Sequence, residues 1–268
     1  MDSDDPTYKK KRKALSAAFL KSKMTEIIAM IKSTALRCFA ELQAKGDENT
    51  VDLNMFTSTV QAHIIVTLMV GPGHSFETLP YVSLATGVES QITLAEFLDK
   101  LLLDIMTRIL SNPLVTMHEY FNGVQWTKAD KAFFANCRIL RAFIARIIES
   151  KKTAKDSSAN DVVSLLLDDE NYQNTNDIID DIIIMFFAGS KTVQVTTTNL
   201  ITSMLHEPEE FARLRAEIDP FMDKVKDNIM GKLDLESIQE LEFVQICYLE
   251  SMRISSPEGA SSTSCMSR

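Results

Sequence analysis

Side chains suited to holding a flat ligand stand together within the apolar stretch from Asn174 to Glu207. Ala188 and Gly189 carry almost no side chain, and Thr192 brings a hydroxyl three residues after the glycine. Gly189, Thr192 and Thr196 would share one face of a helix, because they are spaced i, i+3 and i+7. The stretch therefore predicts a notch in which a flat ligand approaches the backbone and meets a hydroxyl.

The same residues allow two other interpretations. In the first, the small residues mark a close helix crossing, and the threonine hydroxyls bond back to the preceding turn. On this stretch alone, that packing role is the preferred interpretation. In the second, the β-branched run from Thr192 to Thr198 forms a strand, although the apolar pattern on both sides favours a helix.

Two groups of charged residues lie near the ends of the chain. Between Tyr8 and Phe19 stands a dense basic run of Lys9, Lys10, Lys11, Arg12 and Lys13. On a protein with a net charge of −9, such a run suits an acidic partner or an anionic ligand, although a solvated helix face or a nuclear-import signal gives the same pattern. Glu250 and Arg253 stand at i, i+3, a common helix surface pair that contributes about a few tenths of a kcal/mol.

These groups need helices to position them. Asn174 can cap the first free N–H groups of a long helix, acidic residues follow it in the first turns, and Pro208 ends the pattern. We therefore expect one continuous helix over Asp177–His206. Within it Ile182–Ala188 is apolar on every side, which predicts a segment that is buried all round.

Helix-period apolar residues predict further helices on both sides of the central one. The expected ranges are Met24–Lys45, Val51–Val70, Ile92–Leu110, Lys128–Lys152, Asp161–Leu167, a helix after Glu207 and a last segment over Leu235–Ser255. The region Gly73–Gly123 is otherwise irregular, and the apolar residues of Ile92–Leu110 either cover a cavity or simply pack. His63 lies on an apolar stripe with no second ligand at i±4, so a core role is favoured over a metal ligand.

Composition narrows the class of protein. With 268 residues, 45% of them hydrophobic, the chain can bury the core of one large domain or two small ones. Only eight glycines and seven prolines interrupt it, which favours a mostly helical fold. The net charge of −9 argues against nucleic acid as a main partner. The four cysteines have no metal-ligand spacing and are expected to be reduced thiols, and neither a signal peptide nor a transmembrane segment is expected.

Three motifs follow one another along the chain: an aromatic-x-x-x-Arg helix at Tyr8 and Arg12, the Ala-Gly-x-x-Thr notch and the Glu-x-x-Arg pair. In this order the sequence resembles the cytochrome P450 family of haem-thiolate monooxygenases. The resemblance implies a mostly α, P450-like helical domain around one long central helix, without the haem-ligand loop and most of the β-sheets. Residues 1–268 would form a single incomplete domain. Residues 1–160 would cover the family's helix C to helix G region, and residues 161–268 would run from the central helix to the Glu-x-x-Arg helix.

The resemblance implies haem as the cofactor and assigns residues to it. Arg12 would pair with a haem propionate, with the aromatic ring of Tyr8 beside it. Ala188 and Gly189 would let the porphyrin and dioxygen approach the backbone. Thr192 would hydrogen-bond the dioxygen and help deliver protons, and the reaction would insert one oxygen atom of O₂ into a lipophilic small molecule.

The resemblance gives the charged groups other roles. Glu250 and Arg253 would be structural and would support the haem-ligand loop. The face that receives an acidic redox partner, such as a P450 reductase, would carry Lys9, Lys10, Lys11 and Lys13. A full-length parent would lie at the cytosolic face of the endoplasmic reticulum membrane, whereas the chain as given is expected in the cytoplasm without a membrane anchor.

The sequence departs from the family pattern in three places. Tyr8 stands where the family usually has tryptophan, and Lys191 stands where an acidic residue usually precedes the threonine. No Phe-x-x-Gly-x-Arg-x-Cys-x-Gly loop follows Arg253, and Cys265 has neither the glycines nor the arginine of that loop. We therefore expect an internal piece of the family fold that is inactive as given, because the axial cysteine ligand is absent. The alternative is a cofactor-free helical scaffold or interaction protein.

Overall fold

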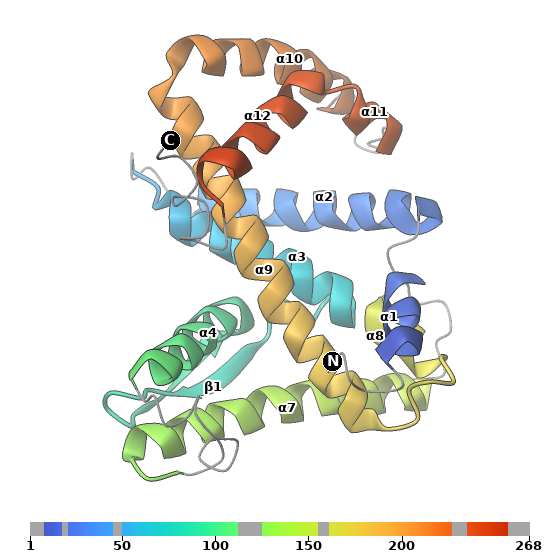
Figure 1. Cartoon of the computed structure of the whole chain (residues 1–268), viewed down its shortest axis with the longest axis vertical. Coiled ribbons are helices and arrows are strands. Elements are labelled where there is room, and N and C mark those ends of the chain that lie inside the picture. Colours follow the sequence, from blue (N-terminus) through green and yellow to red (C-terminus); the bar gives the residue numbers. More distant parts are fainter. Residues whose placement is uncertain are drawn as a thin grey trace, which may run out of the picture. The chain divides into compact units, whose positions relative to one another are not determined.

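The computed structural model describes residues 8–17, 21–44, 50–111, 125–154, 161–226 and 235–256, which are predominantly helical (Figure 1). The chain divides into two compact units. The first holds Met1–Ala18 and Ala62–Phe187, and the second holds Phe19–Gln61 and Ala188–Arg268. Two helices contribute residues to both units: α3 (Leu53–Val70) and α9 (Thr175–His206).

The ends of α9 follow from the local sequence. Asn174 precedes the helix, and its Oδ1 accepts a hydrogen bond from the N–H of Asn176 at 3.0 Å. The helix continues without a break to His206, and Pro208 begins the next helix, α10 (Pro208–Lys226). The expected continuous helix and its asparagine cap are therefore confirmed.

The expectation that Ile182–Ala188 is buried on every side is wrong. Ile182 and Phe186 are fully buried, but Ile184 is 48% exposed and Ala188 is exposed as well. The described segments of the first unit cover one side of α9 and leave the side of Ile184 accessible. A helix segment can therefore be apolar on every side and still leave one side exposed.

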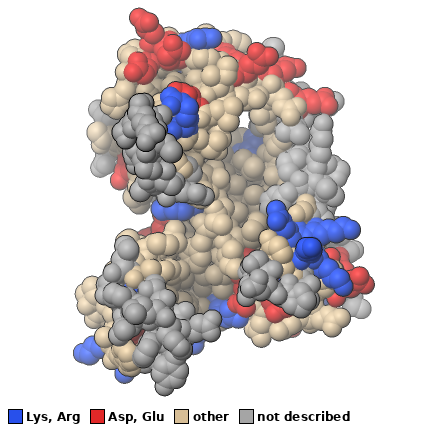
Figure 2. Space-filling model, in the orientation of Figure 1, with Lys and Arg blue, Asp and Glu red and all other residues tan. Residues whose placement is uncertain are grey.

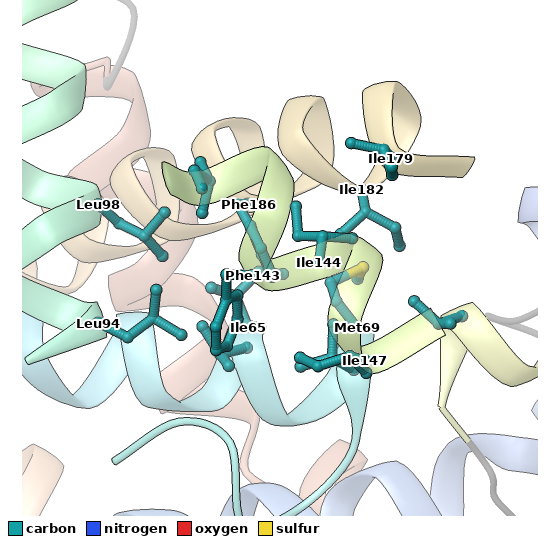
Figure 3. Close-up of a cluster of buried hydrophobic side chains, with 14 of the residues drawn as sticks. Ile65, Met69, Leu94, Leu98, Phe143, Ile144, Ile147, Ile179, Ile182 and Phe186 are labelled. Atoms are coloured by element: carbon teal, nitrogen blue, oxygen red, sulfur yellow. The ribbon is translucent and has the colours of Figure 1, made fainter. Parts of the chain in front are cut away.

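The core of the first unit forms where helices from distant parts of the sequence meet. α4 (Leu94–Ser111), α7 (Lys128–Ala154) and α8 (Val162–Leu167) pack with residues 62–70 of α3 and residues 175–187 of α9. α1 (Tyr8–Ala17) lies against α8. Figure 3 shows the centre of this cluster, with Ile65, Met69, Leu94, Leu98, Phe143, Ile144, Ile147, Ile179, Ile182 and Phe186.

A hairpin lies on α7 within the region that we expected to be irregular. Its antiparallel strands are β1 (Thr78–Val82) and β2 (Glu89–Thr93). Asn136 of α7, which is fully buried, accepts a hydrogen bond from the N–H of Val82 and donates one to its carbonyl, both at 2.9 Å. The amide thus pairs backbone groups of β1 that would otherwise be buried without partners. The helix expected from Ile92 starts only at α4, because Ile92 belongs to β2.

The second unit contains α2 (Lys21–Ala44), residues 53–61 of α3, residues 188–206 of α9, and α10. Its last helices are α11 (Leu235–Gln239), which lies against α2, and α12 (Glu242–Ile254), which lies against α10. The segment expected over Leu235–Ser255 is therefore two helices. α12 starts anew with a cap from α10: Glu217 accepts hydrogen bonds from the N–H groups of Phe243 and Val244.

α3 has the contacts of a core helix. Among the described helices it is the one that is long and apolar enough to span a membrane, but 56% of that window is buried inside the fold. His63 is 3% exposed and stacks on Phe76, with 3.9 Å between the ring centroids. The core role expected for His63 is confirmed.

Candidate functional site

The predicted notch lies on α9 within the second unit. Ala188 and Thr192 are exposed and Gly189 is half-buried, so the small residues leave an accessible strip of helix surface. Lys191 beside them is half-buried and interacts with its surroundings. The structure thus brings Ala188, Gly189 and Thr192 together as expected from their spacing.

The threonine hydroxyls of this strip bond back to the preceding turn. Thr192 Oγ1 donates to the carbonyl of Ala188 at 2.7 Å, and Thr196 Oγ1 donates to the carbonyl of Thr192 at 2.9 Å. The backbone contacts expected under the packing interpretation are confirmed. They do not exhaust the hydroxyl of Thr192, because a hydroxyl has two acceptor lone pairs besides its proton. Since Thr192 is exposed, it can still accept a hydrogen bond from a group placed against the strip.

Tyr8 and Arg12 lie one turn apart on α1, in the first unit. Arg12 is exposed, and its Nη1 donates to the hydroxyl oxygen of Tyr8 at 3.3 Å. A guanidinium has five N–H donors, so this contact leaves several of them for an anion. These donors are accessible to a carboxylate, and the pairing of Arg12 with a haem propionate stays a prediction.

The lysines of the basic run on α1 are of two kinds, exposed and ion-paired. Lys9, Lys10 and Lys13 are exposed, and Figure 2 shows basic side chains gathered over α1. The side chain of Lys11 is only 13% exposed: its Nζ lies 2.8 Å from Oδ2 of Asp177 and 5.7 Å from the centre of the Tyr172 ring. Lys11 thus joins α1 to the start of α9 within the first unit.

Glu250 and Arg253 form a bidentate pair on α12, in the second unit. Arg253 Nε donates to Oε2 of Glu250 at 2.7 Å, and its Nη2 donates to Oε1 at 2.5 Å. These hydrogen bonds hold the pKa of Glu250 below its ordinary value. Both side chains are exposed, so the pair remains accessible to a further segment.

The described cysteines Cys38, Cys137 and Cys247 are free thiols in buried or half-buried positions. Burial, together with the nearby Glu41, raises the pKa of the Cys38 thiol to about 11. Burial also raises the pKa of Cys137 and of Cys247. A raised pKa favours the protonated thiol, whereas the metal ligand is the thiolate. Cys265 lies outside the described residues, among which no cluster of three or more His, Cys, Asp or Glu could hold a metal ion.

A cavity of about 360 Å³ opens in the first unit between α4, α7 and α9. Most of its wall is apolar, and its lining includes Leu101, Ile105, Leu140, Ile183, Ile184 and Phe187. Arg141 and Asp180, which form an ion pair, supply the charged part of the lining. Small-molecule sites usually measure roughly 300–1,000 Å³ and are mostly apolar with a few polar groups. This cavity therefore has the size and the lining of a site for a small lipophilic molecule.

We expected the apolar residues of Ile92–Leu110 either to cover a cavity or simply to pack. Leu101 and Ile105 of α4 line this cavity, which fits the first of these roles. Its α7 and α9 walls were not identified from the sequence. The signal that could have found them is the surplus of apolar side chains at Ile182–Ala188. A segment that is apolar on every side must either bury each face or offer one face to a ligand.

Comparison with solved structures identifies the fold. The crystal structure of the haem domain of cytochrome P450DA matches with a TM-score of 0.69 at 14% identity. The match covers 94% of this chain and 50% of that chain. The described helices thus have the architecture of a P450 haem domain.

A family profile for cytochrome P450 matches residues 1–262, and the chain belongs to the cytochrome P450 family. Cytochrome P450 76C1 of Arabidopsis thaliana is 33% identical over 126 residues, which are 45% of this chain and 24% of that relative. Cytochrome P450 3A56 of Fundulus heteroclitus is 20% identical over 262 residues, which are 94% of this chain and 50% of that relative. The chain thus spans half or less of the length of these relatives.

Haem is the group that this family implies, and the described residues fit it in part. Ala188 and Gly189 carry almost no side chain, Thr192 offers an exposed hydroxyl on the same helix, and Arg12 offers an exposed guanidinium on α1. Among the described cysteines, Cys38 and Cys247 are buried and Cys137 is half-buried, so none of them presents an exposed thiol to a haem iron. The described residues thus offer a hydroxyl in the second unit and a guanidinium in the first, and no exposed thiol.

Proposed function

We propose that the chain supplies the distal wall of a P450 haem pocket, whose reaction is the monooxygenation of a lipophilic small molecule with O₂. The observation that carries the proposal is the accessible strip at Ala188 and Gly189, with the hydroxyl of Thr192 beside it. Haem, when bound, supplies the activation of O₂. The carbonyl of Ala188 accepts the hydroxyl proton of Thr192 in a hydrogen bond, so that Oγ1 presents its lone pairs to a donor placed against the strip.

The lipophilic character of the proposed substrate rests on the cavity of the first unit. Its lining consists mainly of aliphatic and aromatic side chains, and its charged residues Arg141 and Asp180 already neutralise each other. A charged substrate would lose its hydration there without gaining an unpaired counter-ion. Phe187 lines the cavity and directly precedes Ala188 along α9. The residue proposed to contact the substrate and the first residue of the strip are therefore consecutive in one helix.

The proposed redox partner is acidic, because Lys9, Lys10 and Lys13 present positive charge on an otherwise acidic chain. Complementary charge mainly raises the rate of encounter and selects the partner's orientation. Lys11 is left out of this surface, since it is held by Asp177. Glu250 and Arg253 are proposed as a structural pair that holds a further segment of the fold.

Titration of the purified chain with haem, followed by Soret absorbance, tests the proposal. We expect saturable binding that Gly189→Phe weakens by about tenfold, or about 1.4 kcal/mol, because the added ring fills the strip. The matched control is Thr202→Phe, which places the same ring at an exposed position further along α9 and should leave binding unchanged. Equal binding by both variants and the unchanged chain would contradict the proposal.

The reduced, carbon monoxide-treated chain identifies the axial ligand. Because no described cysteine presents an exposed thiol, we expect the chain as given to lack the long-wavelength Soret band of thiolate-ligated haem, and so to be inactive by itself. A band that survives replacement of Cys38, Cys137 and Cys247 would instead assign the ligand to Cys265.

A second candidate function is a helical scaffold without a cofactor. The observation that favours it is that no described cysteine is exposed: Cys38 and Cys247 are buried and Cys137 is half-buried. Under this alternative the haem titration shows no saturable change, and Gly189→Phe has no more effect than Thr202→Phe.

A further inference from the structure

In the second unit, side chains of α3 reach across to α9 with hydrogen bonds. Oγ1 of Thr57 lies 2.6 Å from Oγ1 of Thr198, and Gln194 Nε2 donates to Oδ1 of Asn54 at 2.6 Å. Gln194 is 2% exposed and Thr57 is also buried, so this α3–α9 seam is both polar and buried. Such contacts fix one arrangement of two helices, because a shift would leave buried polar groups without partners.

One contact of the seam reaches the strip on α9 itself. Gln61 Nε2 donates to the carbonyl oxygen of Gly189 at 3.3 Å. In a continuous α-helix that carbonyl also accepts from the N–H of Val193, four residues on. The carbonyl of Ala188 likewise receives a second donor, the hydroxyl of Thr192. Two successive carbonyls of the strip therefore each carry a side-chain donor, one from α9 and one from α3.

The strip is the portion of α9 that needs such support. Glycine destabilises a helix interior by about 1 kcal/mol relative to alanine, and β-branched residues also lower helix propensity. Gly189 is followed closely by the β-branched residues Thr192, Val193, Val195, Thr196, Thr197 and Thr198. A carboxamide that donates to Gly189 opposes local opening and fixes the direction in which its carbonyl points.

We propose that Gln61 is a positioning residue for the α9 strip: it holds the Gly189 carbonyl so that the backbone stays helical and its open face keeps its shape. Gln61 acts through Gly189 and touches no reacting group. The use of the strip as a haem wall rests on the proposed function, whereas the effect of Gln61 on the strip can be measured without haem.

Amide hydrogen–deuterium exchange of the full chain, read at Val193, tests the proposal. Gln61→Met removes the donor and nearly preserves the shape of the side chain. We expect exchange at Val193 to rise about fivefold, the effect of one neutral hydrogen bond. The matched control is Thr57→Val, which removes another hydrogen bond of the same seam and should change exchange at Val193 less than about twofold.

The Gln61→Glu variant adds a pH profile to the test. A carboxylate has no proton to donate to a carbonyl, whereas a protonated carboxyl group donates its O–H. The exchange rate at Val193, divided by that of the unchanged chain at the same pH, should be high at neutral pH. It should return toward one as the pH falls through the carboxyl pKa, ordinarily about 4.3.

Equal exchange in Gln61→Met and the unchanged chain would overturn the proposal. So would a pH-independent ratio in Gln61→Glu, or an effect of Thr57→Val as large as that of Gln61→Met. Failure of haem binding would count against the proposed function alone, because no haem enters the exchange measurement. The two failures are therefore distinguishable.

Discussion

Replacing Glu217 on α10 should loosen the start of α12, which is a different helix. α12 begins at Glu242 after Leu241, whose side chain makes no capping hydrogen bond. The carboxylate of Glu217 supplies the cap instead, accepting from the N–H groups of Phe243 at 3.0 Å and Val244 at 2.9 Å. Such N–H groups in a first turn have no partner within their own helix.

The size of the effect follows from these two hydrogen bonds. Loss of a side-chain cap costs about 0.5–2 kcal/mol, and loss of a negative charge at a helix start costs about 0.3–1 kcal/mol more. Arg213 stacks on the Phe243 ring at 4.0 Å and still holds α12 to α10 in the variant. We therefore expect Glu217→Ala to lower the free energy of unfolding by about 2 kcal/mol. Glu217→Gln keeps one acceptor oxygen and should lose about 1 kcal/mol.

Urea unfolding followed by circular dichroism measures this loss as a lower midpoint at an unchanged slope. Asp219→Ala is the matched control on the same helix, because Asp219 forms an exposed ion pair with Arg215 at 3.0 Å. Such surface pairs contribute only about 0–1 kcal/mol. Amide exchange at Val244 locates the effect at α12. If Glu217→Ala costs no more than Asp219→Ala, the capping role is refuted.

Two further predictions follow from other side-chain contacts. Asp104 is buried and accepts a hydrogen bond from the Tyr81 hydroxyl at 2.8 Å, and burial is the main cause that raises its pKa. The contribution of Asp104 to stability is therefore fully present below the ordinary pKa of an aspartate and is lost as the pH rises through the raised pKa. The unchanged chain should thus lose stability relative to Asp104→Asn as the pH rises above about 4. A pH-independent difference in urea unfolding would contradict this. Replacing Lys9, Lys10 and Lys13 by glutamate should slow association with an acidic redox protein in stopped-flow measurements, whereas Lys11→Met should mainly lower the free energy of unfolding, because it breaks the contact with Asp177. Equal slowing by both changes would show that Lys11 belongs to the docking surface.

The ends of α9 show what can be predicted from a single sequence. The cap at Asn174 and the stop before Pro208 act on backbone groups a few residues away, so one short window contains both cause and effect. The same holds for the pair of Glu250 and Arg253, whose spacing alone places them on one face.

Contacts between distant segments could not be predicted in this way. Gln61 donates to the carbonyl of Gly189, and the carboxylate of Glu217 caps another helix. No periodic pattern in the sequence indicates either pairing. The exposure of Ile184 is a related case. Hydrophobicity reports how strongly a side chain prefers to leave water, and not which neighbour is available to cover it.

The character of α9 changes between Phe187 and Ala188. Its earlier residues Ile178, Ile179, Ile182 and Phe186 are buried among apolar side chains, whereas the later buried residues are Ser190, Gln194 and Thr196. Apolar contacts are not directional and tolerate small shifts, but a buried hydrogen bond is lost when its partners move apart. The portion of α9 that carries the strip is thus the portion fixed by directional contacts. The hydrogen bonds of Gln61 and Asn54 show that α3 supplies part of this directional support.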